Sequence, residues 1–148
     1  MTITSAAQGD LAQIVALEEQ FTEARWSERS WADELGSDRA LTLVAKDRWG
    51  RLQGVATFNC VEDVADLNRV VVSPEHRRNG IARRLLAAGF EWAEQVGAGR
   101  VLLEVEAGNA PAVTLYESLG FAVLARRANY YGPGLDALVL ELPLESES

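Results

Sequence analysis

Apolar side chains recur along the first third of this chain at the spacing of helices. A short strand is predicted around Ile3, and apolar residues then return every three or four positions from residue 11 to residue 17. Asp10 precedes that run and is its predicted N-cap. A second helix is predicted to start near Ser27, because serine and glutamate suit the first turn of a helix.

The pattern then changes to the alternation of strands. Residues 40–59 read as two strands joined by a turn at 47–50, and residues 66–73 are a third β-branched run, which together predict an antiparallel meander. Three carboxylates lie just before the third run or at its first residue, and we expect them to form an acidic, solvated loop. They are Glu62, Asp63 and Asp66.

Helical spacing returns after Gly80 and is followed by shorter elements. A helix that ends near Gly97 or Gly99, a strand, a short helix with Pro111 near its start, and two strands are predicted. These last four elements cover residues 101–107, 110–121, 122–127 and 137–144. The whole order predicts a mixed α/β, or α+β, fold.

Length and composition predict one domain without metal or disulfide. The chain has 148 residues, 48% apolar and 24% charged, so we expect a single domain over residues 1–144 and a frayed tail at 145–148. Cys60 and His76 are the only cysteine and histidine. One cysteine and one histidine are too few for an internal disulfide, a cysteine metal cluster or a metal site of three histidines.

The net charge and the N-terminal residues indicate which classes of partner to expect. A net charge of −8 argues against nonspecific nucleic-acid binding and suits a cationic partner. The first residues carry neither a basic segment nor an apolar run, and no stretch approaches the roughly 20 apolar residues of a membrane span. We therefore expect a cytoplasmic protein without a membrane partner.

Four arginines gather around one glycine at a predicted helix start. Arg77, Arg78, Arg83 and Arg84 fall within eight positions around Gly80. Free amides and the positive end of a helix favour an anion there, and a pyrophosphate has the matching size and charge. The alternative is a solvated, arginine-rich helix start. The glycine spacing is neither that of a P-loop nor that of a Rossmann site.

Two motifs identify a family resemblance. Residues 77–82 (RRNGIA) resemble the R/Q-x-x-G-x-G/A signature of the GNAT superfamily of N-acetyltransferases, with Ala82 where many members have glycine. Residues 108–121 (GNAPAVTLYESLGF) resemble its second hallmark helix. The resemblance implies the GNAT fold: about seven mostly antiparallel strands, splayed in the middle and flanked by four helices. It also implies acetyl-coenzyme A as co-substrate, without a metal.

A narrower resemblance is to the bacterial RimI group within that superfamily. Residues 26–31, 103–121 and 126–134 carry it, with departures at Glu106 and at an extra Ala128. The resemblance implies transfer of an acetyl group to the N-terminal alanine of a small-subunit ribosomal protein, a basic acceptor. Acetylation of lysines or small amines, and a non-catalytic module that binds acetyl-coenzyme A, are the alternatives.

Acetyl transfer to an amine requires a base of modest strength. An α-amine has a pKa of about 7.7–8.0 and a lysine about 10.4, so deprotonating the lysine costs about 3.4 kcal/mol more. A carboxylate, acting directly or through water, is therefore sufficient for an N-terminus.

Glu104 is the candidate base. Strand alternation places it with Leu102 and Glu106 on one face of residues 101–107, where a merely solvated face is the alternative. The resemblance implies that Glu104 accepts the proton. Glu106 is interpreted as a charge on the acceptor side of the site that could hold an ammonium group.

Tyr116 is the candidate acid for the departing thiolate, by the same resemblance. Its spacing from Val113 and Leu119 also suits a packed core aromatic. Tyr130 and Tyr131 are competitors that either line the acceptor tunnel or are ordinary strand aromatics.

The remaining candidates are coenzyme contacts. Asn109 is either a helix cap or a coenzyme contact, and the valines of residues 70–72 either fill a buried strand or pair their backbone with the pantetheine arm. The full set that the resemblance assigns to acetyl-coenzyme A is Val70, Val71, Val72, Arg77, Arg78, Asn79, Gly80, Ile81, Ala82, Arg83, Asn109 and Tyr116.

Overall fold

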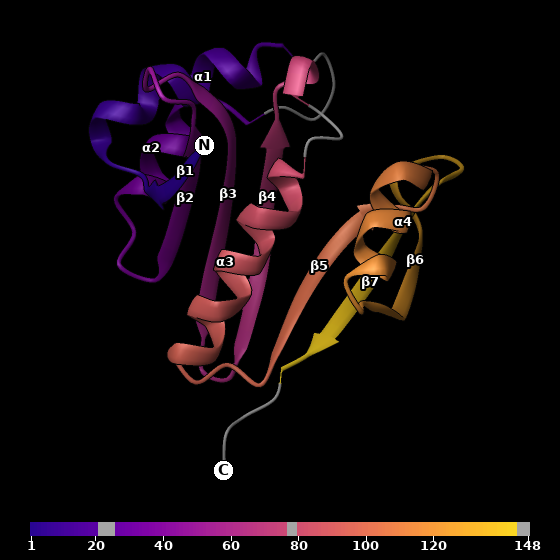
Figure 1. The fold of residues 1–148 in the computed structure, drawn as a ribbon. Coiled ribbons are helices and arrows are strands. Elements are labelled where there is room, and N and C mark those ends of the chain that lie inside the picture. The colour runs from indigo at the N-terminus through magenta and orange to yellow at the C-terminus, as the bar shows by residue number, and fades with distance from the viewer. Residues whose placement is uncertain (21–25, 77–79, 145–148) are drawn as a thin grey trace.

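A computed structural model describes residues 1–20, 26–76 and 80–144, which form one twisted sheet with helices on both faces (Figure 1). Its elements are β1 (Thr2–Ser5), η1 (Gln8–Asp10), α1 (Leu11–Glu18), α2 (Glu28–Leu35), β2 (Ala40–Lys46), β3 (Leu52–Val61), β4 (Val64–Val72), η2 (Pro74–His76), α3 (Ile81–Gln95), β5 (Arg100–Glu106), α4 (Ala110–Ser118), β6 (Ala122–Gly132) and β7 (Leu135–Pro143).

The sheet confirms the predicted fold class. Its seven strands lie in the order β1-β2-β3-β4-β5-β7-β6, and every neighbouring pair is antiparallel except β4 and β5. Ser27 caps α2 as predicted, because its Oγ accepts the Ser30 N–H at 3.1 Å. None of the helices described is long and apolar enough to cross a membrane.

The sheet splays between β4 and β5. These strands pair at only three positions, from Val64 opposite Arg100 to Asp66 opposite Leu102. Beyond them both strands continue, and Figure 1 shows β4 and β5 running apart from that end. Along the described part of the chain, no strand pairs with the β5-facing edge of β4 after Asp66. The predicted splay is therefore confirmed.

A β-bulge in β4 accompanies the splay. Leu67 faces Phe58 on β3 and Arg69 faces Thr57, so Asn68 is an extra residue in β4. The bulge changes which face each later side chain occupies. Leu67 packs in the cluster under α3, whereas Val71 packs in the cluster under α1 and α2. The sequence pattern did not predict this bulge.

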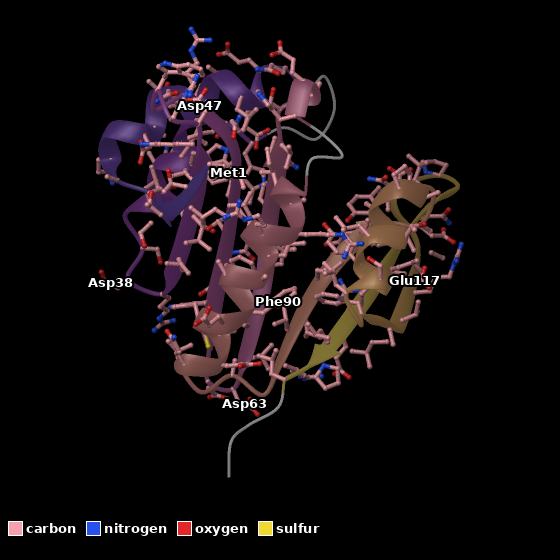
Figure 2. All side chains as sticks on the ribbon, viewed as in Figure 1. Met1, Asp38, Asp47, Asp63, Phe90 and Glu117 are labelled. Atoms are coloured by element: carbon pink, nitrogen blue, oxygen red, sulfur yellow. The ribbon has the colours of Figure 1, made fainter. Side chains whose placement is uncertain are left out.

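A row of aromatic rings joins the two arms of the splayed sheet. Phe58 of β3 meets Phe90 of α3, Phe90 meets Phe121, and Phe121 meets Tyr116 of α4, with ring centroids 6.3, 5.7 and 5.8 Å apart. Figure 2 labels Phe90 on α3, which lies on the same side of the sheet as α4 (Figure 1). Apolar burial on this face therefore holds the arms together where the strands do not pair.

Three local predictions are corrected. Asp10 is the N-cap residue of α1 as predicted, but its carboxylate makes no bond to that helix: it accepts the Ala7 N–H at 2.8 Å and a bond from Lys46 Nζ at 2.6 Å. Asp66 lies inside β4, so the acidic turn is confined to Glu62 and Asp63. The first of the two closing strands, β6, extends five residues beyond the predicted end at 127, to Gly132.

We expect Gly89→Ala to destabilise the protein. Alanine normally stabilises a helix interior by about 1 kcal/mol relative to glycine, but a methyl at Gly89 would overlap the Phe58 ring. Overpacking of this kind costs about 1–3 kcal/mol, measurable as a lower unfolding free energy in urea. Ala87→Gly, at an exposed position of the same helix, measures the propensity difference without the overlap. A Gly89→Ala protein more stable than the parent would contradict the packing described.

Candidate active site

A small cavity lies where β4 and β5 part. It has a volume of about 130 Å³ and is lined from β4, β5 and α4. Its lining residues are Leu67, Asn68, Arg69, Val70, Leu103, Glu104 and Tyr116. The cavity thus brings together the two residues to which the sequence assigned acid–base chemistry, although they come from different elements.

Glu104 projects from the face of the sheet on which α1 packs against β3 and β4 and α2 packs against β2. Leu103 is buried toward α3 and α4, while the Glu104 side chain is one-third exposed, at 33%. The alternation predicted for this strand is therefore confirmed. Oε1 of Glu104 lies 3.2 Å from Nη1 of Arg127, on β6.

Tyr116 reaches the same cavity from the opposite face of the sheet. The residue is 7% exposed, and its ring packs edge-on against Phe121. Burial raises the pKa of Tyr116 to about 12, and the positive charge of Arg69 acts in the opposite direction. The phenol therefore stays protonated at neutral pH. The interpretation of Tyr116 as a packed core aromatic is confirmed, and its role as the acid stays a prediction that its position at the cavity allows.

Arg69 is a cavity residue that sequence reasoning missed. Its Nε and Nη2 donate to the two oxygens of Glu18, each at 2.8 Å, and Trp31 Nε1 donates to Glu18 Oε1 at 3.0 Å. The Glu18 side chain is 2% exposed. A bidentate, buried pair of this kind fixes the guanidinium rigidly. Only the bulge at Asn68 turns Arg69 toward α1, and one extra strand residue has no signature in the sequence pattern.

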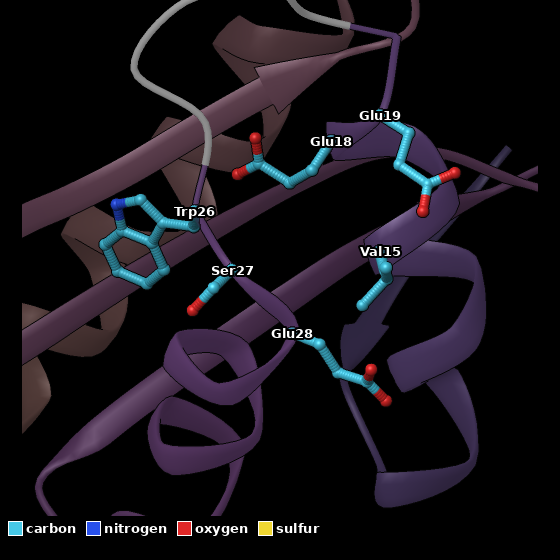
Figure 3. A pocket seen from close by; sticks show the side chains of 6 residues that line it. All are labelled: Val15, Glu18, Glu19, Trp26, Ser27 and Glu28. Atoms are coloured by element: carbon cyan, nitrogen blue, oxygen red, sulfur yellow. The ribbon is translucent and has the colours of Figure 1, made fainter.

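A larger, acidic cavity lies on the other side of Glu18. Its volume is about 520 Å³, and Figure 3 shows the carboxylates of Glu18, Glu19 and Glu28 together with Trp26 around it. The Trp26 ring packs on Trp31 with centroids 4.8 Å apart. The Glu18–Arg69 pair therefore borders both cavities: Glu18 lines this one and Arg69 lines the smaller one.

The described part of the predicted anion loop begins at Gly80. This residue is the N-cap of α3 with φ of 77°, a left-handed conformation that glycine adopts without strain, and a Cβ there would meet no atom within 4 Å. Ile81 is buried under the sheet, and Arg83 Nη2 donates to Ser118 Oγ of α4 at 2.6 Å. Ala82 is half-buried. Arg77, Arg78 and Asn79 lie outside the residues described.

The valine run and Asn109 keep both of their interpretations. Val71 is buried against α1 and α2, and Val70 and Val72 pack partly on the other face. Their backbone follows the edge of β4 that β5 leaves unpaired in the described chain. Asn109 is the N-cap of α4, since its Oδ1 accepts the Ala112 N–H at 3.3 Å. The cap is confirmed, and a coenzyme contact stays a prediction.

The tyrosines of β6 lie near Glu104. Tyr130 and Tyr131 meet edge-on at 5.1 Å, and both are exposed. Burial, and next the negative charge of Glu104, raise the pKa of Tyr131. The negative charges of Tyr130 and Glu106 contribute to that shift in the same direction.

Comparison with known proteins gives one consistent result. Residues 11–121 match the acetyltransferase (GNAT) family. A [Ribosomal protein bS18]-alanine N-acetyltransferase of Escherichia coli K12 is 34% identical over 146 residues, 97% of each chain. The crystal structure of the ribosomal-protein-S18-alanine N-acetyltransferase from Escherichia coli superposes with a TM-score of 0.90 at 32% identity, covering 99% of this chain and 96% of that one.

A third similar protein was solved with a ligand. It is a putative acetyltransferase from Salmonella typhimurium with its cofactor acetyl-CoA, at a TM-score of 0.83 and 26% identity, covering 100% of this chain and 96% of that one.

We expect Tyr116→Phe to remove an alkaline dependence of stability. Between pH 10 and about 12 the unfolded chain loses the Tyr116 proton while the folded chain keeps it, so the unfolding free energy of the parent falls as the pH rises through that window. The fall attributable to this group is about 2–3 kcal/mol. Urea unfolding of both proteins from pH 9 to pH 12 measures it. Parallel curves for the two proteins would contradict the burial of this phenol.

Proposed function

The chain belongs to the acetyltransferase (GNAT) family, and we propose that it transfers an acetyl group from acetyl-coenzyme A to the N-terminal α-amine of a small-subunit ribosomal protein that begins with alanine. The observation that carries the proposal is the cavity between β4 and β5. It places a carboxylate and a protonated phenol on either side of one opening in the sheet, in a chain similar over its whole length to an enzyme of that activity.

The described residues fit acetyl-coenzyme A, which supplies an activated acetyl thioester. The first turn of α3 after Gly80 offers free amides and the positive end of a 15-residue helix to a pyrophosphate, with Arg83 beside them. Arg77, Arg78 and Asn79 belong to this site by the family motif. The unpaired edge of β4 at Val70–Val72 suits the amides of a pantetheine arm, which would add to the sheet as a strand does.

Glu104 is the proposed base. The α-ammonium of the acceptor must lose a proton before its nitrogen can attack, and an α-amine with a pKa of about 7.7–8.0 loses it readily near neutral pH. A carboxylate at the cavity wall, reached from the open face of β5, accepts that proton directly or through water.

Tyr116 is the proposed donor to the departing sulfur. A thiol of the cysteine type has a pKa of about 8.5, so full transfer from a phenol with a pKa near 12 is uphill by about 5 kcal/mol. Tyr116 therefore acts chiefly by donating a hydrogen bond that stabilises the developing thiolate, and the proton itself is taken from solvent or from the acceptor.

The charge around the site supports a basic acceptor. The cavity bordered by Glu18, Glu19 and Glu28 is acidic, and the whole chain carries a net charge of −8. A basic ribosomal protein tail is attracted to such a surface. We propose that residues 1–144 act as one domain in the cytoplasm, with no nucleic acid or membrane as a direct partner.

Labelled acetyl-coenzyme A and a peptide with an alanine-starting, small-subunit ribosomal sequence test the substrate. We expect label on the α-amine of that peptide and none on the same peptide with a blocked α-amine. The reason is that the pKa of a lysine side chain is about 2.5 units above that of an α-amine. Mass spectrometry locates the label. Label on the lysines of the blocked peptide would show the alternative, a lysine acetyltransferase, and no label on either peptide would contradict the proposal.

Steady-state kinetics with that peptide test the two side chains. Glu104→Gln should lower kcat/KM by about 100-fold, since general bases contribute at least that much. Tyr116→Phe should lower kcat by about tenfold, the value of one hydrogen bond to a charged group. The control is Glu117→Gln, an equal loss of charge at an exposed position of α4 outside the cavity (Figure 2). Rates equal to the control in both variants would remove the assigned roles.

A further inference from the structure

The ion-pair partner of Glu104 comes from the far edge of the sheet. Arg127 lies on β6, and β7 separates that strand from β5. In the register of the sheet Glu104 faces Val139 of β7, whereas Arg127 faces Ala137. The arginine side chain therefore crosses β7 diagonally to bring its Nη1 within 3.2 Å of Glu104 Oε1.

The neighbouring arginine has a different partner. Arg126 Nε donates to Asp136 Oδ2 at 2.8 Å, within the β6–β7 hairpin. Consecutive side chains of a strand point to opposite faces, so only the second of the two arginines shares the face of Glu104. Arg126 provides a matched control: it has the same chemistry on the same strand, and its partner is Asp136 rather than Glu104.

The pair that Arg127 forms with Glu104 is loose compared with the pair that Arg69 forms with Glu18. Arg69 makes two bonds of 2.8 Å to a buried carboxylate. Arg127 makes one contact of 3.2 Å, and its side chain is 53% exposed. Exposed single contacts of this kind contribute little free energy and exchange easily. While it contacts Glu104, the Arg127 guanidinium also lies 5.3 Å from the Tyr130 ring centroid, so this aromatic ring stabilises the cation independently of the carboxylate.

We propose that Arg127 is a displaceable counter-ion of Glu104, which the ammonium group of the acceptor replaces. The inference rests on the proposed function, in which Glu104 meets an ammonium ion. Before the acceptor binds, Arg127 compensates the carboxylate. When the acceptor binds, its ammonium takes that place, and the Arg127 guanidinium moves further into solvent. One N–H bond of the ammonium then breaks and one O–H bond forms on Glu104, while the guanidinium, which does not deprotonate in proteins, keeps its protons.

The exchange has a direct consequence for turnover. The acceptor amine enters as a cation and leaves as a neutral amide. A cation competes with Arg127 for the carboxylate, whereas an amide does not, so the return of Arg127 to Glu104 favours release of the acetylated product. The cost is a weaker affinity for the incoming amine, because that amine must displace a charge already present.

Calorimetry with coenzyme A present tests the exchange. The ligands are the alanine-starting peptide with a free α-amine and the same peptide already acetylated. For Arg127→Gln we expect the Kd of the free-amine peptide to fall by about two- to fivefold, since an exposed competing cation is removed. The Kd of the acetylated peptide should not change. Arg127→Lys, which keeps the charge, should stay close to the parent, and Arg126→Gln should match the parent for both peptides.

In steady-state kinetics, Arg127→Gln should lower the KM for the free-amine peptide more than it changes kcat. A rise in the Kd of the free-amine peptide would overturn the inference, because Arg127 would then contact the acceptor itself. So would an equal fall for both peptides, or the same fall in Arg126→Gln, because neither depends on the ammonium charge.

The design separates this inference from the proposed function. A parent protein that binds the free-amine peptide without acetylating it refutes the proposed function, and the Kd comparison still decides the role of Arg127. If the peptide does not bind, the comparison is made with spermidine and its acetylated form. A parent protein that binds neither amine overturns both proposals.

Discussion

The site depends on the parting of β4 and β5 after three paired residues. A strand edge presents N–H and C=O groups that need hydrogen-bond partners, and an open edge in the middle of a sheet is stable only where water or a ligand reaches it. The aromatic row from Phe58 to Tyr116 keeps the arms packed on one face, so the opening forms without unfolding the sheet. The opening brings together the unpaired edge of β4 at Val70, the Glu104 carboxylate and the Tyr116 phenol.

Local rules predicted much of the fold. Alternation placed Glu104 away from Leu103, serine chemistry located the start of α2, and the change of period at Gly80 located α3. The second motif drew attention to Asn109 and Tyr116, and the structure confirms the cap and the cavity position of these residues. Such features depend on neighbours within one or two turns, which a single sequence displays directly.

Long-range and irregular features could not be predicted in the same way. Arg69 and Glu18 are 51 residues apart and meet only because the bulge at Asn68 reverses the face of β4. Arg127 reaches Glu104 across a strand whose register the sequence does not specify. Asp10 occupies the predicted N-cap position of α1, but its carboxylate bonds to Lys46 of β2 instead of to the helix amides. In each case tertiary contacts decide the outcome.

The Glu18 carboxylate has a consequence for how this protein can diverge. Glu18 lines the acidic cavity, and its carboxylate also accepts two hydrogen bonds from Arg69, which lines the smaller cavity. A substitution of Glu18 would also leave Arg69 without its bonded carboxylate at the edge of the smaller cavity. If the proposed roles of the two cavities hold, changes at Glu19 and Glu28, which line only the acidic cavity, alter acceptor recognition alone, whereas a change at Glu18 alters both cavities.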